Sequence, residues 1–108
     1  MEISYTDVFK KHVRRLSRRY RSLHNDLAPV INELATGVLL GDRITGLDDV
    51  VYKVRVKNSD NQKGKSGGYR VIYYVKTEEE IRLMAMYAKS DQANISDNSL
   101  RRILSDDQ

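Results

Sequence analysis

The segment 50–57 constrains the fold more than any other part of the chain, because from Tyr52 onward it alternates strictly between apolar and basic side chains. Its apolar positions are Tyr52, Val54 and Val56, and its basic positions are Lys53, Arg55 and Lys57. Successive side chains of a β-strand point to opposite faces of a sheet, so a period of two predicts a strand. The sequence therefore predicts a half-buried strand whose outer face is cationic.

Helical periodicity dominates the region that precedes this strand. Apolar residues recur in steps of three and four over residues 9–34, which marks one face of helical structure. Thr6 can cap its start, and Gly37 can cap its end. Because Pro29 lacks a backbone N–H, one continuous helix is not expected, and we predict two helices with a break between residues 20 and 26.

The remaining elements complete an α+β pattern. Alternation over residues 3–5 predicts a short strand, and the aromatic and β-branched residues 69–75 predict a second long strand. Residues 81–88 are almost wholly apolar, which predicts a strand in the centre of the sheet. Ser96 precedes a predicted terminal helix over residues 97–104. We predict an antiparallel sheet of about four strands, with an N-terminal helical hairpin packed on it, a short C-terminal helix, and the helices on one sheet face.

Composition limits the chemistry that the chain can perform. Its 108 residues allow one hydrophobic core, and we expect a single domain over residues 1–108. The absence of cysteine excludes disulfides, cysteine nucleophiles and thiolate zinc sites. His12 and His24 lack metal-ligand spacing, so neither a metal nor another cofactor is expected. No apolar run reaches membrane-spanning length and no leader profile is present, so we expect a cytoplasmic protein with no membrane partner.

The charge is unevenly distributed along the chain. The net charge is only +4, yet residues 1–24 hold seven basic and two acidic side chains, and residues 51–76 hold seven basic and one acidic. Local fields of this strength attract polyanions. A charge run is also the ordinary composition of a solvated surface, so charge alone does not decide between the two interpretations.

Basic and phenolic groups concentrate on and between the predicted strands. The basic members are Lys53, Arg55, Lys57, Lys63, Lys65, Arg70 and Lys89. Arginine binds phosphate through paired hydrogen bonds and lysine supplies a mobile charge, while a tyrosine such as Tyr87 can stack on an unpaired base. The same groups can cleave RNA without a metal, through attack of the ribose 2′-hydroxyl on its own phosphate.

Tyr87 has two interpretations at this stage. Nearby positive charge lowers the pKa of a phenol and makes it a better base. However, simple alternation places Tyr87 on the same face as Ile81, Leu83 and Ala85, which favours a role as a packed core aromatic. Both interpretations stay open.

Three segments together resemble the RelE/HigB group of toxins from type II toxin–antitoxin systems. They are Tyr-Lys-Val-Arg at 52–55, Gly-Lys-Ser-Gly-Gly-Tyr-Arg-Val-Ile-Tyr-Tyr at 64–74 and Tyr-Ala-Lys-Ser-Asp-Gln at 87–92. The glycine-lysine segment is most similar to the HigB-like branch. With the helical regions on either side, the resemblance covers almost the whole chain.

The resemblance implies a metal-independent endoribonuclease that cuts messenger RNA in the ribosomal A site and thereby inhibits translation. It implies catalytic roles for Lys53, Lys65, Arg70 and Tyr87. With the charge pattern, it suggests RNA binding by Arg55, Lys57, Lys63 and Lys89. The general base stays open among Tyr87 and a lysine that has lost its proton, Lys53 or Lys65.

The resemblance also implies partners. The expected partners are the ribosome with its messenger RNA and a cognate antitoxin with a helix-turn-helix domain, through which alone the complex reaches operator DNA. The cations of the first predicted helix are candidates for docking on ribosomal RNA or on an acidic antitoxin segment, and we favour ribosomal RNA for Lys10, Lys11, Arg14, Arg15 and Arg18. Their alternative is a solvated face whose alkyl stems cover the apolar stripe.

Two alternatives to a nuclease are kept. A toxin of the ParE type keeps the scaffold and inhibits DNA gyrase, but it lacks much of the basic set that this sequence retains. A non-catalytic RNA- or ribosome-binding module needs the charge without a particular base.

Overall fold

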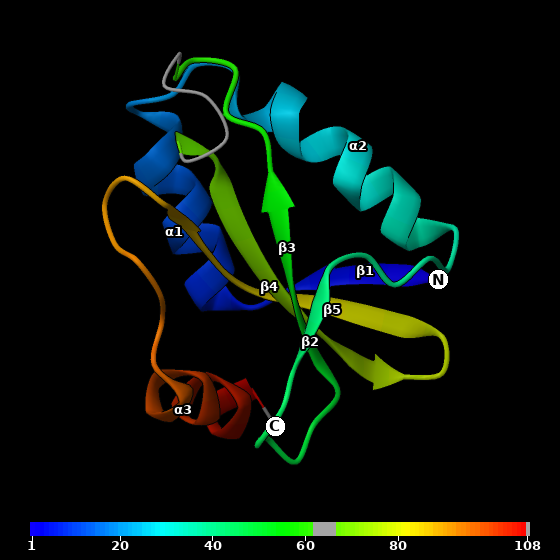
Figure 1. Ribbon diagram of the computed structural model, residues 1–108. Helices are drawn as coiled ribbons and strands as arrows, with labels where there is room; N and C mark the ends of the chain where they lie inside the picture. Colours follow the sequence, from blue (N-terminus) through cyan, green and yellow to red (C-terminus); the bar gives the residue numbers. More distant parts are fainter. Residues whose placement is uncertain (62–66, 108) are drawn as a thin grey trace.

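A five-stranded sheet forms the centre of the computed structural model, which describes residues 1–61 and 67–107 (Figure 1). Its elements are β1 (Glu2–Tyr5), α1 (Asp7–Ser17), α2 (Leu23–Ala35), β2 (Asp42–Ile44), β3 (Val51–Val56), β4 (Tyr69–Thr77), β5 (Glu80–Ala88) and α3 (Asp97–Asp107). The strand order is β1-β5-β4-β3-β2. The β1–β5 pair is parallel and the other neighbours are antiparallel. The predicted α+β class is confirmed, with one strand more than the expected four and one parallel pair.

The N-terminal helices begin and end largely where the sequence predicts. Thr6 Oγ1 accepts the N–H of Phe9 at 3.0 Å and caps α1. Gly37, with φ of +96°, follows the last turn of α2. The break between the helices lies at residues 18–22, which overlaps the predicted interval and begins two residues before it. Pro29 does not cause this break, because it lies inside α2 at an exposed position where solvent can reach the helix backbone.

The helices cover opposite faces of the sheet. α1 and α2 pack on one face, where Leu16 belongs to the same core as Val54. α3 packs on the other face, where Leu104 belongs to the same core as Val51 and Tyr74. The prediction that all helices lie on one face is therefore wrong. The second face is apolar at its α3 end, so it needs a helix of its own to bury that surface.

An ion pair fixes the last turn of α3 to the sheet. Arg82 Nε donates to both carboxylate oxygens of Asp107 at 2.7 and 2.6 Å, and the hydroxyl of Tyr74 donates to the same carboxylate. Burial alone raises the pKa of Asp107, but the hydrogen bonds from Arg82 and Tyr74 outweigh it and lower that pKa below its ordinary value. Asp107 is therefore ionised at neutral pH and holds α3 in place.

No helix in the described part of the chain is long and apolar enough to cross a membrane.

Gly41 allows β2 to approach β3 closely. Its φ is +87°, and a Cβ at this position would lie 2.3 Å from the carbonyl oxygen of Lys53. Gly46 has nearly the same φ, +86°, but a Cβ there meets nothing within 4 Å. An alanine at Gly46 would therefore have only the conformational cost of a left-handed backbone, whereas an alanine at Gly41 would add the cost of a steric clash.

We expect Gly46→Ala to lower the free energy of unfolding by about 1 kcal/mol, the cost of a left-handed residue with a Cβ. Gly41→Ala should lower it by at least about 2 kcal/mol, because a backbone clash adds to the same conformational cost. Urea unfolding of both variants measures the difference. Equal losses would contradict a close approach at Gly41.

Candidate functional site

A β-bulge in β5 decides which side chains face the candidate site. Ile72 pairs with Ala85 and Tyr73 with Leu83, so Met84 is an extra residue in β5. As a result, Leu83 belongs to the core under α1 and α2, whereas Ala85 and Tyr87 belong to the opposite face. The expected grouping of Tyr87 with Leu83 is wrong, because simple alternation does not count the extra residue.

Three functional candidates form a row across the middle of the sheet. Arg55 of β3 pairs with Arg70 of β4, and Arg70 pairs with Tyr87 of β5. Direct cross-strand partners point to the same face and lie side by side. Lys53 lies on the same face, two residues before Arg55, and its cross-strand partner is Ile72. The structure thus brings together four of the residues that the sequence analysis named as catalytic or RNA-binding candidates. We call Lys53, Arg55, Arg70 and Tyr87 the cationic row.

Glycine leaves space beside this row. Lys89 N–H donates to the carbonyl oxygen of Gly68 at 2.9 Å, two positions beyond the Arg70–Tyr87 pair. A Cβ on Gly68 would lie 2.6 Å from the carbonyl oxygen of Val56 and 3.8 Å from Arg70 Nη1. No side chain therefore stands over the guanidinium of Arg70 from this position. Lys57 is exposed just beyond the end of β3.

Arg70 is the most buried cation of the row. It is 8% exposed, and its Nη1 donates to the carbonyl oxygen of Tyr69 at 3.1 Å. The two salt bridges found among the described residues, Arg19–Asp91 and Arg82–Asp107, lie outside the row. Arg70 is therefore held in place without a carboxylate from the described chain, which leaves its charge available to an anion.

Tyr87 is protonated at neutral pH. The residue is 4% exposed, and burial raises the pKa of its phenol, while the nearby Arg70 guanidinium acts in the opposite direction with a smaller effect. The sequence-based expectation of a lowered pKa is therefore wrong in its net direction. A neutral phenol can donate a hydrogen bond but is a poor proton acceptor. The ring packs as a core aromatic with Val51, Ile72 and Tyr74, so it has no free face on which a base could stack.

Asn94 is a site residue that the sequence analysis missed. Its Oδ1 lies 3.4 Å from Lys53 Nζ and 3.5 Å from the Tyr87 hydroxyl. In the same loop Lys89 Nζ donates to the carbonyl oxygen of Ala93 at 3.1 Å, so the predicted RNA-binding Lys89 is engaged by its own loop. An asparagine in a polar, aperiodic loop gives no sequence signal. Asn94 lies beside Lys53 and Tyr87 because of the course that the chain takes after β5, which no local sequence pattern indicates.

The segment that leads into the glycine-lysine region is tied to the start of α2. Asp60 accepts the N–H of Ser22 at 2.7 Å, and Asp26 accepts the N–H of Ser59 at 2.9 Å. Each aspartate also accepts the hydroxyl of the same serine. Two reciprocal pairs therefore hold residues 59–60 against the helix. The predicted site residues Lys63 and Lys65 lie outside the described residues.

The predicted docking cations lie away from the cationic row. Lys10, Lys11, Arg14 and Arg15 are exposed on α1, and Arg18 is exposed directly after it.

In the described ranges no group of three or more His, Cys, Asp or Glu side chains is placed to hold a metal ion.

Residues 6–105 match the family described as the RelE toxin of the RelE/RelB toxin–antitoxin system. The chain belongs to the RelE toxin family. No individual curated protein matches it. Family membership makes the protein the toxin of a toxin–antitoxin pair, with a cognate antitoxin as its partner.

A histidine of the toxin positions the strand that carries Tyr87. His12 Nδ1 on α1 accepts the N–H of Met86 at 3.1 Å, beyond the point where β1 ends. Burial lowers the pKa of His12, and the positive charge of Arg15 lowers it further. Only an unprotonated Nδ1 can accept this hydrogen bond. The contact therefore depends on neutral His12.

We expect the stability of the toxin to fall as the pH is lowered from 7.5 to 5.5. The unfolded histidine titrates near pH 6.5 and the folded one lower, so the unfolded state binds more protons in this window; one proton gives a slope of at most about 1.4 kcal/mol per pH unit. Urea unfolding at several pH values measures the slope. His12→Gln should reduce the slope, and His24→Gln, at an exposed position of α2, is the matched control. Equal slopes for wild type and His12→Gln would contradict this role.

Proposed function

We propose that this toxin is a ribosome-dependent messenger RNA endoribonuclease that cleaves without a metal and so inhibits translation. The observation that carries the proposal is the cationic row, in which two guanidinium groups and a phenol lie side by side with Lys53 next to them. Messenger RNA supplies an anionic phosphate that can accept hydrogen bonds from the cations and from the phenol hydroxyl.

The proposed reaction is an internal transfer at phosphorus. The ribose 2′-oxygen attacks the adjacent phosphorus, the bond from phosphorus to the 5′-oxygen of the next nucleotide breaks, and a 2′,3′-cyclic phosphate and a 5′-hydroxyl result. A base takes the 2′-hydroxyl proton and an acid protonates the leaving 5′-oxygen. Arg70 and Arg55 bind the phosphate and stabilise the negative charge that develops on it.

The raised pKa of Tyr87 argues against this residue as the base. Because the Tyr87 ring is only 4% exposed, we assign Tyr87 to hydrogen-bond donation through its hydroxyl and keep Lys53 and Lys65 as the candidate bases. Lys57, Lys63 and Lys89 are proposed to contact RNA phosphates beside the row. Because the row is short, a ribosome that holds the message in register supplies the remaining positioning.

The exposed cations of α1 are proposed to dock on ribosomal RNA. Lys10, Lys11, Arg14 and Arg15 are exposed, and Arg18 follows at the C-terminal end of the helix. Phosphate contacts of this kind contribute affinity without sequence preference.

The remaining assignments follow from this activity and from the HigB-like glycine-lysine segment. We propose action in the cytoplasm, where ribosomes are found. We also propose an antitoxin with a helix-turn-helix domain, through which the complex reaches operator DNA.

Arg70→Ala should lower the rate of messenger RNA cleavage on ribosomes roughly 100-fold, the usual effect of removing one preorganised charge stabiliser. Tyr87→Phe keeps the ring and should lose less than Tyr87→Ala. The matched control is Arg43→Ala, which removes an exposed arginine of β2 outside the row. Mapping transcript ends in a purified translation system measures cleavage.

Three outcomes would overturn the nuclease proposal. The first is growth arrest by the wild type with intact messages. The second is DNA breakage in place of message cleavage, as a gyrase inhibitor would cause. The third is ribosome-bound wild type that cleaves no message, as a binding module would behave.

The double reversal Arg14→Glu/Arg18→Glu should reduce co-sedimentation with ribosomes at least tenfold at low salt, because it replaces attraction to phosphate by repulsion. Its control is Arg101→Glu/Arg102→Glu, which makes the same change of net charge at two exposed arginines of α3. Unchanged co-sedimentation of the first variant, or an equal loss in both, would remove α1 as the docking surface.

A further inference from the structure

Asn94 joins two hydrogen-bond donors of the cationic row that come from different strands. It lies in the loop that leads from β5 to α3 (Figure 1). Its Oδ1 faces Lys53 Nζ of β3 at 3.4 Å and the Tyr87 hydroxyl of β5 at 3.5 Å. Because β3 and β5 flank β4, one amide oxygen contacts a group on either side of the strand that carries Arg70.

The chemistry of an amide suits this position. Its oxygen accepts hydrogen bonds but does not titrate, so Asn94 does not compete for the protons of the reaction. A lysine amine donates to that oxygen with or without its extra proton, so the contact is compatible with Lys53 as a base. Both distances are long for hydrogen bonds, as catalytic contacts often are before the substrate binds. The two donors can therefore turn from Asn94 to a phosphate.

The backbone of Asn94 is fixed by the loop that carries it. At the start of this loop Lys89 N–H donates to the carbonyl oxygen of Gly68 at 2.9 Å, beyond the last pair of β4 and β5. Lys89 Nζ donates to the carbonyl oxygen of Ala93 at 3.1 Å. Gln92 Nε2 donates to the carbonyl oxygen of Asn94 itself at 3.0 Å. These hydrogen bonds define the point from which the Asn94 side chain extends.

An ion pair anchors the same loop to the end of α1. Arg19 Nη1 donates to both carboxylate oxygens of Asp91 at 2.9 and 2.8 Å. The backbone N–H groups of Arg19 and Tyr20 both donate to the carbonyl oxygen of Leu16, at 3.0 and 2.9 Å, so this part of the chain is tied to the helix. An exposed ion pair contributes little to the free energy of unfolding. Its effect is therefore on where the loop lies.

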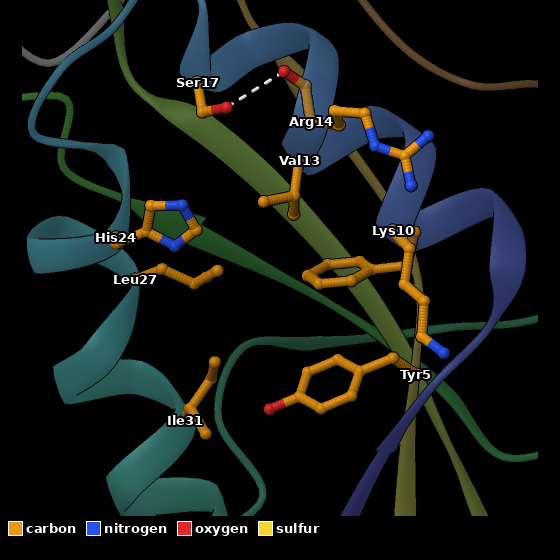
Figure 2. A pocket seen from close by; sticks show the side chains of 9 residues that line it. Tyr5, Lys10, Val13, Arg14, Ser17, His24, Leu27 and Ile31 are labelled. Carbon is orange, nitrogen blue, oxygen red and sulfur yellow. Dashed lines mark hydrogen bonds between the residues drawn. The ribbon is translucent and has the colours of Figure 1, made fainter.

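Arg19 thus differs from the cations proposed to dock on ribosomal RNA. Figure 2 shows the last turn of α1, where the Ser17 hydroxyl donates to the carbonyl oxygen of Arg14 at 2.9 Å. In the same view the Arg14 guanidinium extends away from His24 of α2. Among the described residues Arg14 has no salt bridge, whereas the charge of Arg19 is paired with Asp91. Arg14 is available to a phosphate, and Arg19 positions the loop.

We propose that Asn94 is a positioning residue of the cleavage site, whose amide oxygen holds Lys53 and the Tyr87 hydroxyl in place. The two groups then flank a phosphate bound by Arg70. The ion pair between α1 and the loop acts one step further away, by placing Asn94. The proposal rests on the proposed ribonuclease function and names a side chain on which the geometry of that site depends.

Asn94→Ala should lower kcat for ribosomal cleavage roughly tenfold and change KM less than about twofold, because it removes orientation and leaves every charge in place. The matched control is Asn98→Ala, which removes an exposed asparagine of α3 whose Oδ1 accepts from Arg101 at 3.0 Å. The control should cleave like wild type. An unchanged kcat in Asn94→Ala, a rise in KM alone, or an equal loss in the control would overturn the proposal.

The role of the ion pair is tested by a double-mutant cycle. Asp91→Ala should lower kcat about threefold in the wild-type background and cause no further loss in the Asn94→Ala background, because the pair acts through Asn94. Losses that multiply in the double variant would show that the ion pair acts independently and would overturn this part of the proposal.

The contact itself is measured without RNA. ¹³C relaxation of the Lys53 ε-methylene in the free toxin reports its mobility, which should rise in Asn94→Ala and stay low in Asn94→Asp, because aspartate keeps an acceptor oxygen at the same position. Circular dichroism establishes that both variants are folded. Equal mobility of Lys53 in a folded Asn94→Ala toxin would overturn the proposal. If Lys53 responds as expected but the wild type cleaves no message, the ribonuclease proposal fails and the positioning of Lys53 by Asn94 stands.

Discussion

The extra residue in β5 links the hydrophobic core to the cationic face. Before the bulge, Leu83 points into the core under α1 and α2; after it, Ala85 and Tyr87 point to the other face. Without the bulge, the side-chain period of two would place Tyr87 beneath the helical hairpin. Arg55 and Arg70 reach their row by regular alternation of β3 and β4. A single inserted residue is therefore what sets a phenol beside two guanidinium groups.

The second face of the sheet is divided between stability and binding. At one end α3 buries Val51 and Tyr74, and the Arg82–Asp107 pair holds that helix down. At the other end lie like charges that no carboxylate of the described residues pairs with. Neighbouring like charges oppose folding, and a bound phosphate relieves that repulsion. The apolar end thus contributes the stability that lets the other end stay cationic.

The sequence predicted those parts of the fold that follow a regular period. The alternation at 52–57 identified the cationic strand face, and Thr6 and Gly37 marked helix ends. The sequence could not predict the bulge at Met84, because residues 81–88 are apolar at almost every position and an inserted residue therefore does not interrupt any visible alternation. The same limit hid Asn94, whose role depends on where β5 delivers its loop. Pro29 misled for another reason: α2 continues through it, and its exposed position lets solvent satisfy the carbonyl oxygen that its missing N–H leaves free.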